Sequence, residues 1–267
     1  MGRFAVILPA AGRSSRFGDV KEKKVFADLE GRAVWLHSVG PFLNRDDVCQ
    51  IILAIAPDDR ERFERRFRAN VAFLNIQVVD GGAERHDTVA RSLEKLTEDV
   101  AYVAIHDAAR PCLTSELIDD VFAAARRFGA ALPGIPVADT LKRVRDDGMI
   151  LKTVSRAGLR AVQTPQAFRR DWLIAAYERR DRLDATITDD AQLVEALGHA
   201  CHVVPGSSFN HKITNLEDLR LASLILRTRA GAKVAPAHPF GDEEASWSAV
   251  PKVRPEDLFG GPSEELG

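Results

Sequence analysis

The sequence predicts an α/β protein in which helices cover both faces of a mostly parallel sheet. Short, continuous apolar runs alternate with segments of helical spacing along most of the 267 residues. Apolar runs of this kind are typical of strands that are buried on both faces, as they are in parallel sheets. Hydrophobic residues make up 45% of the chain, which is enough for one large core. Together these observations favour three layers, with helices on either side of the sheet.

Six apolar runs are the strand candidates, and the first begins close to the N-terminus. They are Phe4 to Leu8, Ile51 to Ile55, Ile76 to Val79, Ala101 to Ile105, Ala130 to Val137 and Cys201 to Val204. None shows the strict alternation of polar and apolar residues that a half-exposed strand would have. We therefore expect both faces of these strands to be covered.

Helices are predicted between the strands, and three of them have clear end signals. Thr114 suits the N-cap of the first and Gly129 suits its C-cap. A second helix is expected from about Asp189 to Leu197, with Thr188 placed to cap it. A third is expected to start after Asn215.

Two segments do not fit this alternation of strands and helices. Within about 138–165, the stretch "DTLKRVRDDGMILKTVSR" predicts two short polar strands around an Asp-Asp-Gly turn. A polar hairpin inside an α/β domain is expected to reach outward as an arm. Residues 230–267 are rich in proline, glycine and acidic residues without any period, so we expect a mostly disordered tail. The remaining residues, 1–229, are expected to form one domain.

Composition disfavours several classes of protein. The net charge is −2, whereas a domain that grips nucleic-acid backbone is usually basic. The three cysteines, Cys49, Cys112 and Cys201, are far apart and predict buried thiols rather than disulfides or a zinc site. Neither a signal peptide nor an apolar run of roughly 18 residues, the length of a membrane helix, is recognisable, so a cytoplasmic protein is expected.

The loops that follow three predicted strands contain the candidate functional residues. They read "PAAGRSSRFG", "DGGAERHDTV" and "HDAARP". Ligands of open parallel sheets bind outside the carboxyl ends of the strands, so we expect these loops to meet at one edge. Their small residues, arginines and aspartates suit a nucleotide phosphate with a metal. The first loop has neither the dinucleotide-binding pattern G-x-G-x-x-G nor a P-loop lysine.

Individual side chains in and near these loops have a functional and a structural interpretation. Arg16 is expected to meet phosphates, and one of three nearby lysines, Lys21, Lys23 and Lys24, would add a second positive charge if it points inward. Arg85 falls in a first helical turn, where a cation opposes the helix dipole, which favours a functional role. Asp107 is a candidate magnesium ligand. The alternatives are solvated charges for the basic residues and a loop cap for Asp107.

Taken together, the motifs resemble the 2-C-methyl-D-erythritol 4-phosphate cytidylyltransferase family from about Phe4 to Arg229. "PAAGRSSR", "DGGAERHDTV", "HDAARPC", "VADTLKRV", "VSRAGLRAVQTPQAF", "ATITDD" and "HKITNLEDL" occur in the family's order. The resemblance implies a Rossmann-like nucleotidyltransferase domain. It also implies transfer of CMP from CTP to 2-C-methyl-D-erythritol 4-phosphate, with release of pyrophosphate, in non-mevalonate isoprenoid synthesis. The alternatives are a cytidylyltransferase for another polyol phosphate, such as ribitol 5-phosphate, and a non-catalytic nucleotide-binding protein.

The resemblance also implies roles for particular residues. Contacts with CTP are implied for Ala10, Ala11, Gly12, Gly82, Arg85, Thr88 and Ala108, and contacts with the sugar phosphate for Thr140, Arg156, Thr188 and Lys212. Catalysis would depend on Arg16, Lys24, Arg156 and Lys212, and Asp107 would hold Mg²⁺. Alignment on Phe26 selects Lys24 as the family lysine, whereas counting forward from Arg16 selects Lys23.

In this family the arm crosses to a second subunit, which implies a homodimer with exchanged arms. Thr140 and Arg156 would then act in the partner's site. One position departs from the family pattern. Phe209 stands before Asn210-His211-Lys212, where the family often has an acidic or polar residue. A second carboxylate for the metal is therefore missing or comes from elsewhere.

Overall fold

The computed structural model describes residues 2–12, 17, 23–182 and 186–232. The chain divides into two compact units, Met1–Arg227 and Thr228–Gly267, and the fold below is that of the first. Arg16 and nearly all of the expected tail lie outside the described residues. None of the helices in the described part of the chain is long and apolar enough to cross a membrane.

The central sheet has eight strands in the order β10-β7-β11-β6-β1-β4-β5, with β12 paired to β7. The six predicted strands are β1 (Arg3–Pro9), β4 (Val48–Ile55), β5 (Gln77–Asp80), β6 (Val100–Ile105), β7 (Ala130–Pro136) and β12 (His202–Pro205). Neighbours among these six pair in parallel, which confirms the predicted sheet. The short strands β10 (Arg160–Val162) and β11 (Gln166–Arg169) were not predicted, and both run antiparallel to β7.

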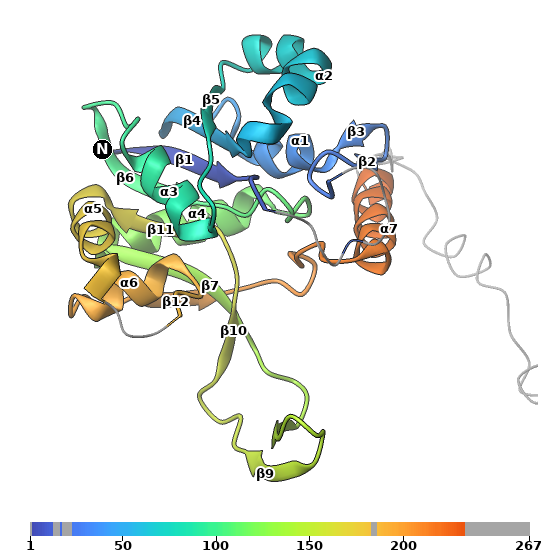
Figure 1. The fold of residues 1–267 in the computed structure, drawn as a ribbon, viewed down its shortest axis with the longest axis vertical. Coiled ribbons are helices and arrows are strands. Elements are labelled where there is room, and N and C mark those ends of the chain that lie inside the picture. Colours follow the sequence, from blue (N-terminus) through green and yellow to red (C-terminus); the bar gives the residue numbers. More distant parts are fainter. Residues whose placement is uncertain (1, 13–16, 18–22, 183–185, 233–267) are drawn as a thin grey trace, which may run out of the picture. The chain divides into compact units, whose positions relative to one another are not determined.

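Helices cover both faces of this sheet (Figure 1). They are α1 (Val34–Val39), α2 (Arg60–Phe73), α3 (Arg85–Leu93), α4 (Ser115–Phe128), α5 (Arg170–Glu178) and α6 (Asp190–Ala196). The last helix, α7 (Leu216–Ala232), begins in this unit and ends in the second, and its residues before Thr228 pack against the core. Alternate residues of β1 separate the two cores. Phe4 and Val6 pack with α1, α2, α4 and the first turns of α7, whereas Ala5 and Ile7 pack with α3, α5 and α6. The three predicted layers are therefore present.

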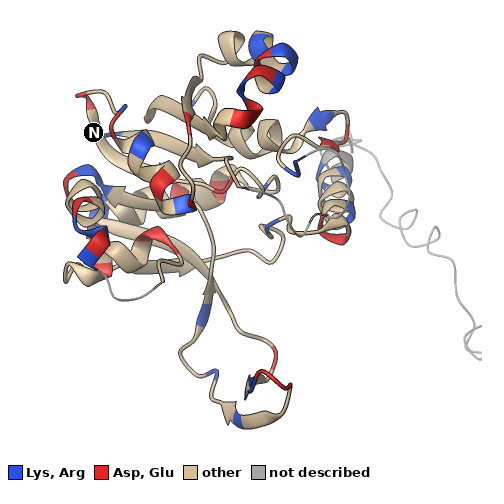
Figure 2. Cartoon of the chain, in the orientation of Figure 1, with Lys and Arg blue, Asp and Glu red and all other residues tan. Residues whose placement is uncertain are grey.

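Short elements complete the unit. They are the two-stranded pair β2 (Asp28–Leu29) and β3 (Arg32–Ala33), and the 3₁₀ turns Gly40–Phe42, Pro57–Asp59 and Arg180–Arg182. Basic and acidic residues are interleaved along α2, as Figure 2 shows. Of the three free cysteines, Cys112 is buried as expected, but Cys49 and Cys201 are only half-buried.

Helix ends follow the capping rules, with one correction. Thr114 caps α4 through its side chain, and Gly129 ends that helix with a φ of +88°, as predicted. The cap of α6 is Asp189 and not Thr188, because the Asp189 carboxylate accepts the backbone N–H of Gln192 at 3.1 Å. The Thr188 hydroxyl instead donates to the side-chain carbonyl of Gln192.

Strand β11 has a direct consequence for the edge where ligands are expected. It runs antiparallel to β6, with Gln166 opposite Ile105. The start of β11 therefore lies beside the end of β6, and Thr164, which precedes it by a cis peptide bond to Pro165, lies next to Asp107. An antiparallel strand in this position adds its leading residues to the carboxyl edge of the parallel strands.

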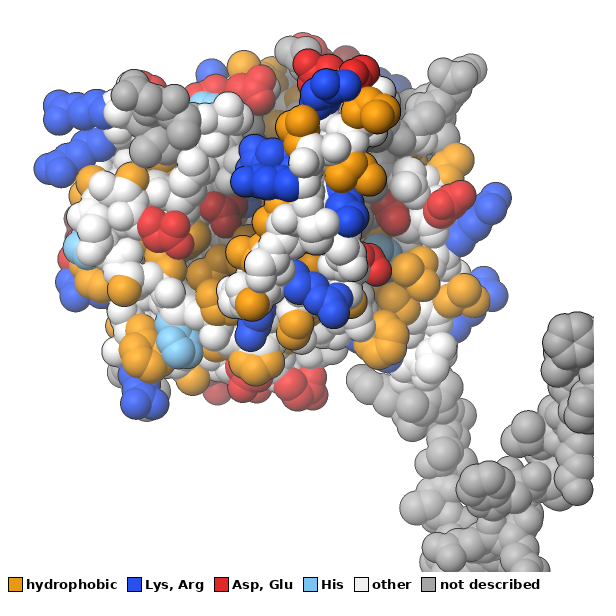
Figure 3. Space-filling model, turned by 90° about the horizontal axis from the view of Figure 1, so that it is seen from below, with side chains coloured by type: hydrophobic (Ala, Val, Ile, Leu, Met, Phe, Trp, Pro, Cys, Tyr) orange, Lys and Arg blue, Asp and Glu red, His pale blue; other side chains and the backbone are white. Residues whose placement is uncertain are grey.

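The arm is a hairpin of β8 (Leu141–Val144) and β9 (Ile150–Val154), joined through the predicted turn. It extends away from the sheet beyond β7 and β10 (Figure 1). The expectation of a polar arm was incomplete, because several apolar side chains on it are more than half exposed: Val144, Met149, Ile150 and Leu151. Figure 3, seen from the side of the arm, shows hydrophobic side chains lying among lysines and arginines.

Candidate functional site

The three predicted loops line one cavity of about 340 Å³. β1, β4, β5 and β6 run parallel, so the loops after β1, β5 and β6 emerge at the same edge of the sheet. The lining residues are Pro9, Ala10, Ala11 and Gly12 from the first loop, Gly82, Ala83, Glu84, Arg85 and Thr88 from the second, Asp107, Ala108 and Ala109 from the third, and also Lys24, Val25 and Lys212. Most of the predicted site residues thus lie together.

Close packing explains the small residues in these loops. A Cβ atom on Gly81 would lie 2.4 Å from the Cβ of Ala11, and one on Gly82 would lie 2.2 Å from the Cβ of Asp87. The hydroxyl of Thr88 accepts the Gly82 N–H at 3.0 Å and donates to the carbonyl of Glu84. Thr88 therefore fixes the shape of the loop, and its contact with a ligand stays a prediction.

Asp107 lies at the centre of a charged cluster and is only 7% exposed. Its carboxylate is 2.9 Å from the Lys212 ammonium and 3.4 Å from each of the Arg85 and Arg110 Nε atoms. Burial alone would raise the pKa of Asp107, but these three cations hold the pKa well below its usual range. Asp107 is therefore a carboxylate throughout the neutral range.

A second carboxylate holds Arg85 from the other side. The Nη2 atom of Arg85 is 2.8 Å from Oδ2 of Asp190, which is fully buried at the start of α6. Burial works against the charge of Arg85, but Asp190 and Asp107 together raise its pKa above the ordinary value. The hydroxyl of Tyr177 donates to Oδ1 of Asp190 at 2.5 Å. Burial, followed by the Asp190 charge, raises the pKa of Tyr177, so this hydroxyl keeps its proton.

A buried hydrogen-bond chain fixes the backbone at Asp107. The hydroxyl of Thr164 accepts the Asp107 N–H at 3.0 Å, so its own hydrogen goes to Nδ1 of His106, also at 3.0 Å. Nε2 of His106 then donates to the carbonyl of Arg110 at 3.2 Å. Burial lowers the pKa of His106 to about 4, so the imidazole is neutral, as this chain requires. The Asn210 amide donates to the carbonyl of Thr164 and connects the segment that carries Lys212.

Sequence reasoning assigned no role to Arg110, Thr164, Asp190 or Asn210. All four lie within or beside the motifs that were quoted, but most of their partners are distant in the chain, with the Arg110–Asp107 contact as an exception. Asp190, for example, is 105 residues from Arg85. The one available signal was the pair of consecutive aspartates in "ITDD", of which only the first is needed as a helix cap.

The two candidate lysines lie in different surroundings. The Lys23 ammonium is 2.5 Å from a carboxylate oxygen of Asp59, in the 3₁₀ turn before α2. Lys24 lines the cavity. This geometry supports Lys24 as the lysine of the site.

Three predicted residues lie elsewhere in the described part of the chain. Thr140 and Arg156 are exposed on the arm, and Thr188 is exposed on the loop before α6; none of them lines the cavity. Phe209 is 57% exposed and brings no carboxylate. Among the described residues, no group of three or more His, Cys, Asp or Glu side chains could hold a metal ion. Of the two carboxylates in the cavity lining, Glu84 accepts a backbone N–H in the capping box of α3, which leaves Asp107 and ligands from the substrate for a metal.

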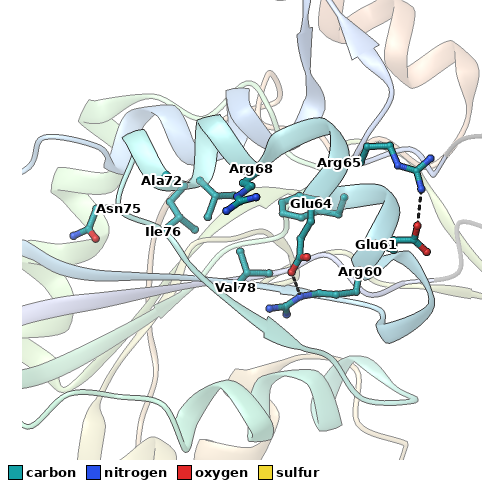
Figure 4. A pocket seen from close by; sticks show the side chains of 11 residues that line it. Arg60, Glu61, Glu64, Arg65, Arg68, Ala72, Asn75, Ile76 and Val78 are labelled. Atoms are coloured by element: carbon teal, nitrogen blue, oxygen red, sulfur yellow. Dashed lines mark hydrogen bonds and ion pairs between the residues drawn. The ribbon is translucent and has the colours of Figure 1, made fainter.

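A larger cavity, of about 960 Å³, lies between α2 and β5 (Figure 4). Four of its five charged residues form two ion pairs, Arg60 with Glu64 and Arg65 with Glu61, each at 2.7 Å, and Arg68 is the fifth. None of the three predicted loops contributes to it. The predicted loops therefore make the smaller cavity the candidate functional site.

Comparisons with known proteins agree on one family. The profile of the family described as "2-C-methyl-D-erythritol 4-phosphate cytidylyltransferase" matches residues 4–228. A protein of that name from Rhodopirellula baltica is 42% identical over 83% of this chain and 94% of its own length. Another, from Frankia casuarinae, is 43% identical over 84% of this chain and 81% of its own length. The crystal structure of the Thermus thermophilus enzyme of that name matches with a TM-score of 0.69 and 33% identity, over 83% of this chain and 98% of that one.

Proposed function

Since the chain belongs to the 2-C-methyl-D-erythritol 4-phosphate cytidylyltransferase family, we propose that it transfers CMP from CTP to 2-C-methyl-D-erythritol 4-phosphate. The products are 4-diphosphocytidyl-2-C-methyl-D-erythritol and pyrophosphate, in the non-mevalonate isoprenoid pathway. The observation that carries this proposal is the cavity in which the small-residue loops meet Lys24, Arg85 and Lys212.

The chemistry fits these side chains. The acceptor phosphate is already ionised, so its oxygen can attack the α-phosphorus of CTP without a nucleophile from the protein. What the protein must supply is alignment for in-line attack and positive charge against the repulsion of two anions. Arg16 and Lys24 would neutralise the triphosphate. Arg156 and Lys212 would orient the acceptor.

The base would be bound by the small-residue loops. The backbone at Ala10, Ala11, Gly12 and Gly82 faces the cavity without side-chain bulk, and Ala108 leaves room for the ribose. Backbone N–H and C=O groups fixed in this way can pair with one base edge and leave another unsatisfied. This supports CTP as the nucleotide.

Mg²⁺ is the metal that we propose for this site. Mg²⁺ commonly binds through one or two carboxylates, substrate phosphates and water, so the carboxylate of Asp107 is a sufficient protein ligand. The neighbouring cations keep Asp107 ionised. A metal bound at Oδ2 of Asp107 would displace the Lys212 ammonium from that oxygen. When bound, the metal would neutralise charge on the phosphate oxygens.

A homodimer with exchanged arms is the assembly that we propose. Thr140 and Arg156 are exposed and lie outside the cavity of their own chain. The apolar side chains on the arm are exposed as well, which suits contact with another subunit. The arm would bring Arg156 to the partner's acceptor site, and Thr188 would contact the same substrate from its own chain. For the whole assembly we propose a cytoplasmic location, without nucleic acid or membrane as a partner.

Pyrophosphate release provides the direct test. With 2-C-methyl-D-erythritol 4-phosphate as acceptor, we expect CTP to be used at least on the order of a hundredfold better than UTP or ATP, because a site built for one base edge leaves polar groups unpaired with the others. With CTP fixed, ribitol 5-phosphate serves as the competing acceptor. Equal rates with all three nucleotides, or preference for ribitol 5-phosphate, would contradict the proposal.

Metal binding gives a second prediction. Because Asp107 is the one carboxylate proposed to hold it, Mg²⁺ should bind weakly to the free protein and strongly when CTP is present. Asp107→Asn preserves the shape of the side chain but removes its charge, and we expect it to raise the Mg²⁺ concentration needed for half-maximal activity about tenfold. Calorimetry with and without CTP measures the first effect. Tight Mg²⁺ binding to the free protein would mean that another carboxylate takes part.

A further inference from the structure

Asp190 is a buried carboxylate that the proposed reaction does not use. Its side chain is fully inaccessible and does not line the cavity. A buried charge is stable only when it is paired and hydrogen-bonded. Asp190 meets both conditions, since Oδ2 faces Arg85 at 2.8 Å and Oδ1 accepts the Tyr177 hydroxyl. The buried charge of Asp190 is therefore paired with Arg85, which does line the cavity.

The position of Asp190 is itself fixed by the sheet. Gln166, which is 1% exposed on β11, accepts the N–H of Ala191 at 3.1 Å and donates to the carboxylate of Asp189 at 2.9 Å. These two bonds hold the first turn of α6 against the strand. Asp190 lies between the two clamped residues, so its carboxylate is a stationary anchor.

Arg85 is held between two such anchors. Its Nη2 atom is 2.8 Å from Asp190, whereas its Nε atom is 3.4 Å from Asp107. The shorter contact is on the side away from the cavity. Without Asp190, the guanidinium would be free to turn and pair bidentately with Asp107, which is the geometry that arginine and carboxylate prefer. Such a pair would remove both groups from the cavity surface.

We propose that Asp190 is a positioning residue, which holds Arg85 in place for CTP and prevents it from closing onto Asp107. This proposal rests on the proposed function for the identity of the ligand. Asp190 acts only through Arg85 and touches no substrate. Its effect is therefore expected in the affinity for CTP more than in the chemical step.

The test compares three carboxylate and hydroxyl variants of the full-length protein. Asp190→Asn keeps the volume of the side chain but faces Arg85 with a neutral group. We expect the Kd for CTP, measured by calorimetry, to rise at least about tenfold, as for the loss of a buried charge partner. At saturating CTP, kcat should fall less than about threefold. Glu195→Gln is the matched control, because it removes a carboxylate charge from an exposed position of the same helix, and it should bind CTP as the wild type does. Tyr177→Phe removes only the second hydrogen bond and should cost about threefold or less.

Non-additivity gives an independent measure if Asp190→Asn folds poorly. Arg85→Lys keeps the positive charge but cannot reach both carboxylates, so it should weaken CTP binding to a similar degree. The double variant Arg85→Lys/Asp190→Asn should lose no more than the larger single loss, because both changes break the same contact.

Several outcomes would overturn the proposal. They are unchanged CTP affinity in Asp190→Asn, an equal loss in Glu195→Gln, and additive losses in the double variant. A wild type that binds no CTP would overturn it too. A wild type that binds CTP but releases no pyrophosphate with 2-C-methyl-D-erythritol 4-phosphate would refute the proposed function and leave the role of Asp190 standing.

Discussion

Replacing Lys24 with alanine is expected to lower kcat about a hundredfold, whereas replacing Lys23 is expected to change it by less than about threefold. The two lysines are neighbours in sequence but not in environment. Lys24 lines the cavity, and Lys23 is held by Asp59 at 2.5 Å. The loss of one preorganised cation at a transition state of phosphoryl transfer costs about 3 kcal/mol, which corresponds to the expected decrease in kcat of about a hundredfold.

Steady-state pyrophosphate release at saturating CTP and acceptor measures this effect. Lys23→Ala is the matched control, since it removes an identical charge one residue away. Thermal unfolding of both variants should stay close to the wild type, because neither lysine belongs to the core. If Lys23→Ala proves the inactive variant, the assignment of the cavity lysine is wrong. Arg16→Ala is expected from the sequence to resemble Lys24→Ala.

The sequence was sufficient for the main strands and for the edge at which the site lies. Continuous apolar runs identify strands buried on both faces, and the rule that ligands bind at their carboxyl ends then brings three separate loops together. The cavity with Gly12, Arg85 and Asp107 in its lining agrees with that expectation. Each strand and the loop that follows it are adjacent in the chain, so the strands and the ligand-binding edge could both be predicted without a structure.

Strand β11 could not be found in the same way. It has four residues, begins with the buried amide of Gln166 and ends with the exposed side chain of Arg169, so it has no apolar run. Its place between β6 and β7 is determined by pairing with strands formed some 30 to 60 residues earlier. Because Thr164 and Gln166 come with this strand, the hydrogen bonds that hold Asp107 and the start of α6 were not predictable either.

The arm was predicted in position but not in character. Its charged residues dominate the sequence, yet Met149, Ile150 and Leu151 are consecutive and all more than half exposed. Consecutive residues of a strand point to opposite faces, so an arm with no layer packed on either face exposes them all. Within a single chain nothing among the described residues buries these side chains. Contact with a second subunit, as in the proposed homodimer, would bury them, so the arm is the place to test the proposed assembly.

Two inactive variants are therefore expected to restore activity when they are mixed. In a dimer with exchanged arms, each site combines the CTP loops of one chain with the arm of the other. A heterodimer of a Lys24→Ala chain and an Arg156→Ala chain has one site with both substitutions and one site with neither. Random mixing of equal amounts makes about half of the dimers hybrid, with one intact site in two, so about one quarter of wild-type activity should return.

The control for this experiment is a mixture that cannot form an intact site. A Lys24→Ala chain mixed with a chain that carries both Lys24→Ala and Arg156→Ala should stay inactive, because every site then has a defective CTP loop. Subunits must be exchanged before the assay, by mild denaturation and refolding or by co-expression with two affinity tags. Activity that returns in the first mixture and not in the second requires that Arg156 acts across the subunit boundary. Two results would contradict this arrangement, because in either case each chain would have to complete its own site. One is a wild-type protein that sediments as a monomer at micromolar concentration while fully active. The other is a mixture of Arg156→Ala and Lys24→Ala chains that is no more active than the separate variants.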